Sequence, residues 1–211
     1  MDRVGGPMNH TIWPSNANLA QYILDFFEEG YAGHAVDVGA SDGISINTTY
    51  ALEAAHRWTV LSVEANPDFA PLLKKHRAWV EMCACSDHGG LADFHIHQEN
   101  PESFSALKKA AYRQDIWPNE PMTWKVVQVP VATLNQLLAK WEFPKLDVLC
   151  IDTEGTELDV LRGCDLEKWK PKVIVTECWD KVGPIDLYLE ERGYKKTARN
   201  VHNDIFVLRD L

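Results

Sequence analysis

HAVDVGASDG, residues 34–43, is the stretch of sequence that decides the fold. His34 to Val38 has the length and apolar character of a short buried strand. The glycines at positions 39 and 43 end this run and permit a tight turn into a following helix. Because ligands bind beyond the carboxyl ends of strands in sheets built from alternating strands and helices, we expect a ligand site at this turn.

The spacing of the glycines separates two classes of cofactor. A nicotinamide-binding turn has the pattern G-x-G-x-x-G, but Ser41 and Ile44 occupy the second and third glycine positions. Asp42 would repel a pyrophosphate, whereas Asp37 and Asp42 would both attract the ammonium group of a methionine. The loop therefore fits the shorter glycine loop of S-adenosylmethionine-dependent methyltransferases, and a structural turn in an unrelated α/β protein is the alternative.

Strands and helices alternate outward from this loop. Buried strands are predicted over residues 58–63, 79–85, 146–151 and 173–176, and helices over 16–30, 44–56, 66–76, 133–141, 155–163 and 184–192. Only a short turn joins the last two strands, 194–199 and 205–208, so these two must be antiparallel. The pattern predicts an α/β, Rossmann-like class I methyltransferase fold, with a mostly parallel seven-stranded sheet, an antiparallel last strand and helices on both faces.

An insertion of a β-hairpin and loop is predicted around residues 91–131. Apolar residues alternate with Asp93, His95 and His97, which predicts a strand with a solvated polar face in preference to a metal site. Residues 98–122 are expected to form a long excursion with one helix around 103–113. Indole rings can stack on sugars, so Trp117, Trp124 and Trp179 are candidate acceptor contacts, with core packing as the usual alternative.

Composition limits the partners and the cellular location. The 211 residues fit one methyltransferase domain over 31–211, preceded by an N-terminal arm and helix over 1–30. A net charge of -10 disfavours nucleic acid and membranes as partners, and we interpret the basic cluster 74–77 as cations at a helix C-terminus. The five cysteines are odd in number and most lie in apolar strands, which predicts free thiols and a cytoplasmic protein.

Carboxylates follow the other predicted strands. Glu64 ends the strand over 58–63, where an acidic side chain can accept hydrogen bonds from both ribose hydroxyls or can simply be solvated. Asp87 follows the strand over 79–85, where it can accept from an adenine amino group or form an Asx turn. Asp152 ends the continuous apolar run over 146–151, which is typical of a central strand.

With these features the chain resembles the FkbM family of S-adenosylmethionine-dependent methyltransferases. The matching blocks are VDVGASDGISINTTYALE (36–53), WTVLSVEANPDF (58–69), ACSDHGGLADFHI (84–96), VPVATLNQLL (129–138), LDVLCIDTEGTELDVLRG (146–163) and LEERGYK (189–195). The resemblance implies methylation of hydroxyl groups, often on sugars or on glycosylated and polyketide metabolites. Cys150 departs from the pattern, because many members carry Lys just before the Ile-Asp-x-Glu-Gly run.

The prediction is an O-methyltransferase that acts on a hydroxyl of a small molecule or glycan and takes S-adenosyl-L-methionine as its cofactor. By the resemblance Asp37, Gly39, Asp42, Gly43, Glu64 and Ser86 line the cofactor site. The full expected set of cofactor-binding residues is Asp37, Gly39, Ser41, Asp42, Gly43, Glu64, Ala65, Asn66, Ser86, Asp87 and Asp152. A non-catalytic Rossmann-like binding module and, less favoured, a nicotinamide-dependent oxidoreductase are the alternatives.

A base assists removal of the proton from an attacking hydroxyl. Asp152 and Glu154 are the first candidates for this role, and Glu177 and His202 are also expected at the ligand end of the sheet. Glu157 is interpreted as a carboxylate that stabilises the first turn of a helix. No metal ligand is predicted, and a divalent ion held by Asp152, Glu154 and Glu177 is the alternative.

Overall fold

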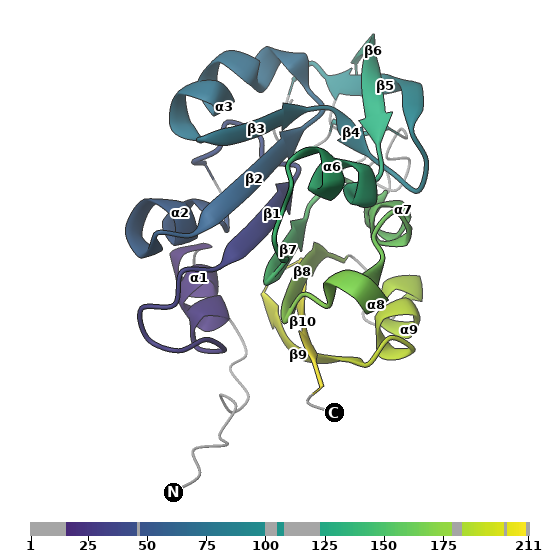
Figure 1. Cartoon of the computed structure of the whole chain (residues 1–211). Coiled ribbons are helices and arrows are strands. Elements are labelled where there is room, and N and C mark those ends of the chain that lie inside the picture. Colours follow the sequence, from purple (N-terminus) through teal and green to yellow (C-terminus); the bar gives the residue numbers. More distant parts are fainter. Residues whose placement is uncertain are drawn as a thin grey trace, which may run out of the picture.

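The computed structural model of the chain describes residues 16–45, 47–99, 105–107, 123–178, 183–200 and 202–209. A seven-stranded sheet with the order β3-β2-β1-β7-β8-β10-β9 forms its centre (Figure 1). The strands are β1 His34–Val38, β2 Thr59–Glu64, β3 Trp79–Met82, β7 Val148–Ile151, β8 Val173–Glu177, β9 Tyr194–Asn200 and β10 Asn203–Leu208. The pairings among the first five of these are parallel, and β10 runs antiparallel to both β8 and β9. The predicted α/β sheet with an antiparallel last strand is confirmed.

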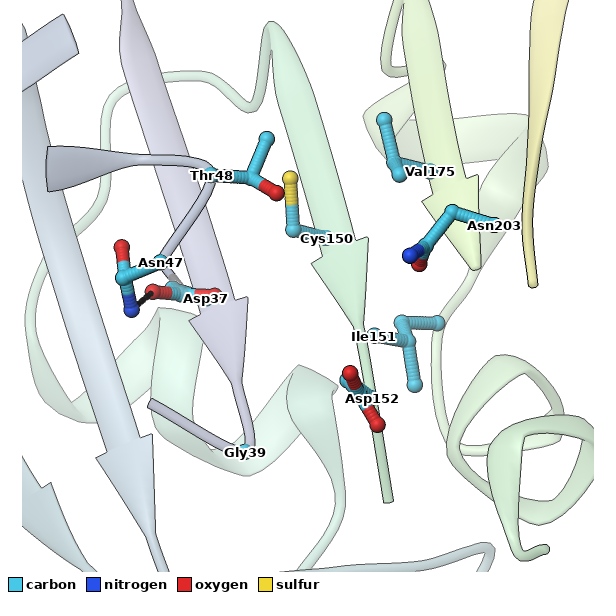
Figure 2. Close-up of a pocket in the computed structure, with 9 residues that line it drawn as sticks. All are labelled: Asp37, Gly39, Asn47, Thr48, Cys150, Ile151, Asp152, Val175 and Asn203. Atoms are coloured by element: carbon cyan, nitrogen blue, oxygen red, sulfur yellow. Dashed lines mark hydrogen bonds between the residues drawn. The ribbon is translucent and has the colours of Figure 1, made fainter. Parts of the chain in front are cut away.

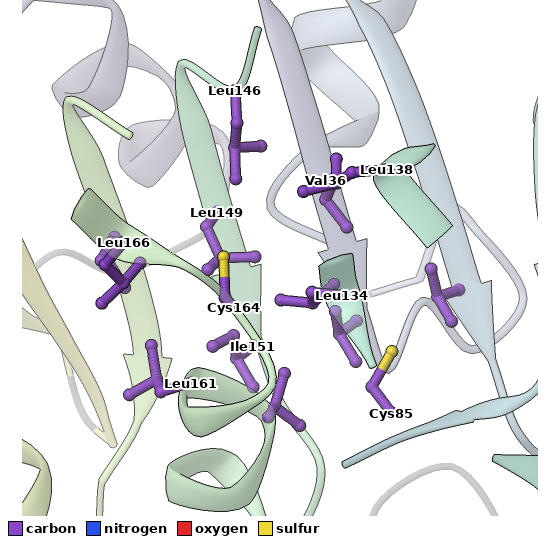
Figure 3. Packing of buried hydrophobic residues seen from close by; sticks show 14 of the residues in the cluster. Val36, Cys85, Leu134, Leu138, Leu146, Leu149, Ile151, Leu161, Cys164 and Leu166 are labelled. Carbon is purple, nitrogen blue, oxygen red and sulfur yellow. The ribbon is translucent and has the colours of Figure 1, made fainter. Parts of the chain in front are cut away.

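Helices cover both faces of this sheet, as the sequence predicted. Alternate residues of each strand point to opposite faces, so the sheet divides two apolar clusters. Side chains from α6, α7 and α8 pack with Val36, Leu149 and Ile151 on one face (Figure 3), and α9 belongs to the same cluster. Side chains from α1 and α2 pack with Ala35, Val148 and Val175 on the other. The helices are α1 Asn16–Leu24, α2 Tyr50–His56, α3 Ala70–His76, α6 Leu134–Lys140, α7 Glu157–Arg162, α8 Leu166–Trp169 and α9 Pro184–Glu190, and η1 Pro67–Phe69 is a 3-10 turn.

The order of strands places a topological switch point beside the glycine loop. From β1 the chain runs outward through β2 and β3, and it later returns to pair β7 with the other edge of β1. Connections that leave β1 in opposite directions open a crevice at the carboxyl ends of β1 and β7. Ligand chemistry is therefore expected where Gly39 and Asp152 follow these two strands.

Several element boundaries differ from those predicted. The helix predicted over 44–56 begins at Tyr50, because the side chain of Asn47 accepts hydrogen bonds from the backbone N–H groups of Thr49 and Tyr50. The helix predicted over 16–30 ends at Leu24, and Phe27 then packs edge-on against Trp58. The predicted boundary between an N-terminal segment and the domain at residue 30 stays a prediction, although α1 shares its core with the sheet.

The insertion forms a second sheet near the carboxyl ends of β2 and β3 (Figure 1). Its strands are β4 Ala84–Cys85, β5 Gly90–His97 and β6 Trp124–Ala132, in the order β4-β6-β5. The hairpin of β5 and β6 was predicted, whereas β4 was expected to continue β3. Of the helix predicted over 103–113 only 105–107 is described, and there Ala106 bridges to His95 instead.

The solvated polar face predicted for β5 is wrong at one position. His97 is fully buried, and its ring meets the ring of Trp124 edge-on with a centroid separation of 5.1 Å. Trp124 is paired with His97 on the neighbouring strand β6, and the alternation of residues within β5 does not reveal this contact. Trp117 and Trp179 lie outside the described residues.

All five cysteines are buried free thiols, as predicted. Burial raises the pKa of the Cys164 thiol to about 12 and that of Cys150 well above its ordinary value. Among the helices of the described segments, none has the length and apolar character needed to cross a membrane.

Candidate active site at the carboxyl ends of the strands

A pocket lies at the switch point between β1 and β7 (Figure 2). Asp37, Cys150 and Val175 form its floor, because they are paired neighbours on adjacent strands and share one face of the sheet. Gly39 and Asp152 lie where β1 and β7 end, and Asn203 begins β10. The complete lining is Asp37, Gly39, Asn47, Thr48, Cys150, Ile151, Asp152, Val175 and Asn203.

Gly39 brings the ends of β1 and β7 together. Its φ of +88° lies in the left-handed region, and a Cβ atom at this position would come within 1.7 Å of the carbonyl oxygen of Asp152. The sequence predicted that Gly39 permits a tight turn and lines the cofactor site. The structure adds that, because glycine has no side chain, the backbone of Asp152 at the end of β7 can lie directly against Gly39.

Asp37 is a buried carboxylate whose oxygen faces the segment between the glycine loop and α2. Its Oδ2 accepts hydrogen bonds from Asn47 Nδ2 at 2.7 Å and from Thr49 Oγ1 at 2.8 Å. Asn47 Nδ2 also donates to the carbonyl of Ala40 at 3.2 Å. These bonds fix the wall of the pocket opposite Asp152 before any ligand binds.

Glu64 ends β2 and links it to the glycine loop. One carboxylate oxygen accepts from the backbone N–H of Ser41 at 2.8 Å, and the other accepts from that of Asn66 at 2.7 Å. Burial raises the pKa of Glu64, although these hydrogen bonds oppose the shift. Because an ionised carboxylate has about four acceptor positions, the two bonds leave capacity for further donors.

Asn66, two residues after Glu64, presents an unusual donor. The residue is fully buried, and its Oδ1 accepts from the backbone N–H of Asp68 at 3.1 Å. Its Nδ2 has no hydrogen-bond partner among the residues that the structure describes. A buried donor of this kind normally has a partner, and a bound ligand would supply one. Ala65, between these two residues, packs against the core of the small sheet.

The other residues of the glycine loop have local bonds. Asp42 accepts hydrogen bonds from the backbone N–H groups of Ile44 and Ser45 and from the Ser45 hydroxyl. Burial opposes ionisation of Asp42, but these bonds outweigh it and lower the pKa. Ser41 adopts a left-handed φ of 51°, and Gly43 one of +83°. The predicted contact of Asp42 with a methionine amine stays a prediction.

Ser86 and Asp87 follow β4 on the way to the small sheet. Ser86 is buried and its N–H donates to the carbonyl of Ala132. Asp87 accepts from the Ser86 hydroxyl at 3.3 Å, and a short bond to His88 lowers the pKa of Asp87. The predicted adenine contact at this turn stays a prediction.

Three of the predicted catalytic carboxylates converge. Asp152, Glu154 and Glu177 each place a carboxylate oxygen within 4.8 Å of the others. Asn203 pairs with Glu177, so the turn that carries His202 lies at the same edge of the sheet. The spacing of the three carboxylates would also suit a divalent cation, so the prediction that no metal binds stays untested.

Three further acidic side chains make contacts within the protein. Glu157 accepts from the backbone N–H groups of Thr153 and Gly155 at 3.0 and 2.9 Å, which agrees with its predicted structural role. Asp186 and Asp204 come together with Cys178, but Lys196 forms ion pairs with both carboxylates.

Several residues of the site were missed by sequence reasoning. Asn47 and Thr48 lay inside a predicted helix, and Arg77 was assigned to a cluster of cations at a helix C-terminus. The run Asn47-Thr48-Thr49 carried a clue, because such residues favour caps over helix interiors. No such clue to the role of Arg77 is present in the sequence, since a cation at the end of a helix is expected to stabilise the helix C-terminus.

The sequence of the chain is similar to those of known methyltransferases. The family model described as the methyltransferase FkbM domain matches residues 37–196. A curated relative, the methyltransferase sdnD of Sordaria araneosa, is 39% identical over 57 residues, which cover 25% of this chain and 22% of that protein.

Two solved structures share the fold. The crystal structure of methyltransferase FkbM from Methylobacillus flagellatus KT has a TM-score of 0.54 and 13% identity, covering 89% of this chain and 50% of that one. The METTL16 MTase domain has a TM-score of 0.52 and 14% identity, covering 93% of this chain and 69% of that one. The chain therefore spans half the length of this FkbM structure.

Proposed function

Because this chain belongs to the FkbM methyltransferase family, we propose that it transfers a methyl group from S-adenosylmethionine to a hydroxyl of a sugar, glycan or related metabolite. The observation that carries the proposal is Glu64, a buried carboxylate at the end of β2 that is tied to the glycine loop through Ser41. A carboxylate in this position suits the two hydroxyls of a ribose.

The residues present fit the cofactor. Glu64 retains acceptor capacity, and Asn66 Nδ2 is a buried donor that lacks a partner within the described segments. Asp37 and Asp152 contribute carboxylates to the neighbouring pocket, where they would attract an ammonium group. When bound, S-adenosylmethionine supplies an activated methyl group, so the protein needs mainly to align the acceptor.

The carboxylates at the ends of β7 and β8 supply the remaining chemistry. Asp152, Glu154 and Glu177 lie close enough to share one hydroxyl, which one of them can orient while another takes its proton. This arrangement supports O-methylation over transfer to a group that needs no base. His202 stays an alternative base from the adjacent turn.

Activity tests this assignment directly. Methyl-labelled S-adenosylmethionine would be incubated with the protein and a panel of sugars and oligosaccharides. With an acceptor identified, Asp152→Asn and Glu154→Gln should keep their fold but lose about 100- to 10,000-fold in turnover, and Glu154→Gln should also keep its affinity for S-adenosylhomocysteine. Asp159→Asn is a matched control, because that carboxylate lies on α7 and pairs with Arg162. Normal turnover in both variants would move the role of base to Glu177 or His202.

The rival classes give different results. An oxidoreductase would bind NADH in calorimetry, and we expect S-adenosylhomocysteine to bind and NADH to give no heat. A non-catalytic module would bind the nucleoside without turning over any acceptor. The free, buried thiols support a reducing compartment such as the cytoplasm, and a small molecule or glycan is the proposed partner.

A further inference from the structure

Arg77 lies beneath the glycine loop instead of in solvent. Arg77 directly follows α3, as predicted for a cation at a helix C-terminus, and its side chain is completely buried. The guanidinium donates to the carbonyl of Gly43 at 3.1 Å, to Asn47 Oδ1 at 3.1 Å and to Thr49 Oγ1 at 2.7 Å. It also forms an ion pair with Glu53 of α2. One buried cation thus binds the loop, the segment after it and the following helix.

Thr49 connects this cation to the floor of the pocket. It occupies the N-cap position of α2, yet its hydroxyl makes no capping bond to that helix. The hydroxyl instead accepts from Arg77 and donates to Asp37. Asn47 takes over the cap and bridges the same two residues, since its Oδ1 accepts from Arg77 and its Nδ2 donates to Asp37.

The loop rests directly on the Arg77 side chain. A Cβ atom at Gly43 would come within 2.7 Å of Arg77 Cγ and within 2.8 Å of Leu73 Cδ1. Gly43 therefore allows the loop to contact α3 closely. The contacts of Arg77 are made within the protein and none needs a ligand, so the loop is held in shape beforehand.

We propose that Arg77 is a positioning residue for the cofactor, which acts through Thr49 and Asn47 to hold Asp37 and the glycine loop in their binding geometry. The inference rests on the proposed function. A preorganised site binds more tightly because less ordering accompanies binding. Loss of the link should therefore weaken cofactor affinity by more than the loss of stability alone explains.

The sharpest test is a matched pair at Thr49. Thr49→Val keeps the shape but removes the hydroxyl link, whereas Thr49→Ser keeps the link. We expect the Kd for S-adenosylhomocysteine to rise about tenfold in the valine variant and to stay within about threefold in the serine variant. Arg77→Lys keeps the charge but cannot reach three partners at once, and it should also lose about tenfold or more.

A control separates positioning from general destabilisation. Asp147 accepts from Tyr31 and from the backbone of His34 at the opposite end of the strands. Asp147→Asn should lower the melting temperature without changing the Kd. Failure of the wild-type protein to bind S-adenosylhomocysteine would overturn the proposed function. The inference would be overturned if Thr49→Val and Arg77→Lys bound with wild-type affinity. It would also be overturned if the Kd followed the melting temperature across all variants, Asp147→Asn included.

Discussion

Ionisation of Glu64 has opposite effects on the stability of the free protein and on ligand binding. Burial raises its pKa above the ordinary 4.5, so the folded protein holds this proton at a higher pH than the unfolded chain does. Ionisation therefore costs the unliganded protein stability as the pH rises through the raised pKa. The same ionisation creates the charged acceptor that ribose hydroxyls need, so ligand binding gains where the free protein loses.

The affinity for S-adenosylhomocysteine should consequently fall as the pH is lowered through the raised pKa of Glu64, which lies above the ordinary value of 4.5. Calorimetric titrations at a series of pH values would measure this fall. Glu64→Gln cannot titrate and should bind weakly with a flat profile over the same window. If the two proteins showed parallel profiles, another group would be responsible and Glu64 would not belong to the site.

Gly39 offers a second test at the scale of one residue. An alanine there would adopt a left-handed backbone and also collide with the carbonyl of Asp152. Gly30 also has a positive φ, of +78°, but a Cβ atom there would meet nothing within 4 Å. Gly30→Ala should therefore cost about 1–2 kcal/mol of backbone strain, and Gly39→Ala should cost about 1–3 kcal/mol more. Equal losses in urea denaturation would contradict the close approach.

Site residues at or near strand ends could be predicted from the sequence, whereas residues that hold the site through side-chain hydrogen bonds could not. Glu64 and Asp152 were predictable because each stands where an apolar run stops, and Asp37 because it lies one residue before the end of β1 and the glycine loop. Asn47, Thr49 and Arg77 were not, because their bonds join positions about 30 residues apart and depend on how α3 packs under the loop. The burial of His97 also depends on a distant segment, the strand that carries Trp124.

At the scale of elements, boundaries were set by local capping that competes with hydrophobic periodicity. α2 begins late because Asn47 caps it, and α8 was not predicted although Asp165 accepts from the backbone N–H of Lys168 to start it. The predicted third strand divides into β3 and β4 because Ala84 and Cys85 pair with β6. Apolar character alone does not reveal which partner a strand takes.

The start of α6 gives a test of this capping. Thr133 Oγ1 accepts from the backbone N–H of Gln136 at 3.2 Å, and Gln136 Oε1 accepts from that of Thr133 at 2.9 Å. Thr133→Ala should lower the free energy of unfolding by about 1 kcal/mol, whereas Thr133→Ser should cost a few tenths. Chemical denaturation would measure both, and equal costs would show that the hydroxyl contributes nothing.

At the scale of the whole molecule, the order of strands brings the site together. The glycine loop, Glu64 and the carboxylates at positions 152 and 177 are far apart in sequence, yet the parallel strands end at one edge of the sheet. This arrangement was predictable from the alternation of strands and helices and from the short last turn. The acceptor was not, because neither the N-terminal arm nor residues 98–122 carry a pattern that specifies a substrate.

The central claim is that the edge formed by the glycine loop and Glu64 binds S-adenosylmethionine. Titration calorimetry with S-adenosylhomocysteine on the wild-type protein and on Glu64→Ala tests it most directly. We predict one site per chain, a higher melting temperature at saturating ligand, and a loss of about 1–3 kcal/mol in binding free energy for the variant. Absence of binding to the wild-type protein, or equal affinity in the two proteins, would contradict the account.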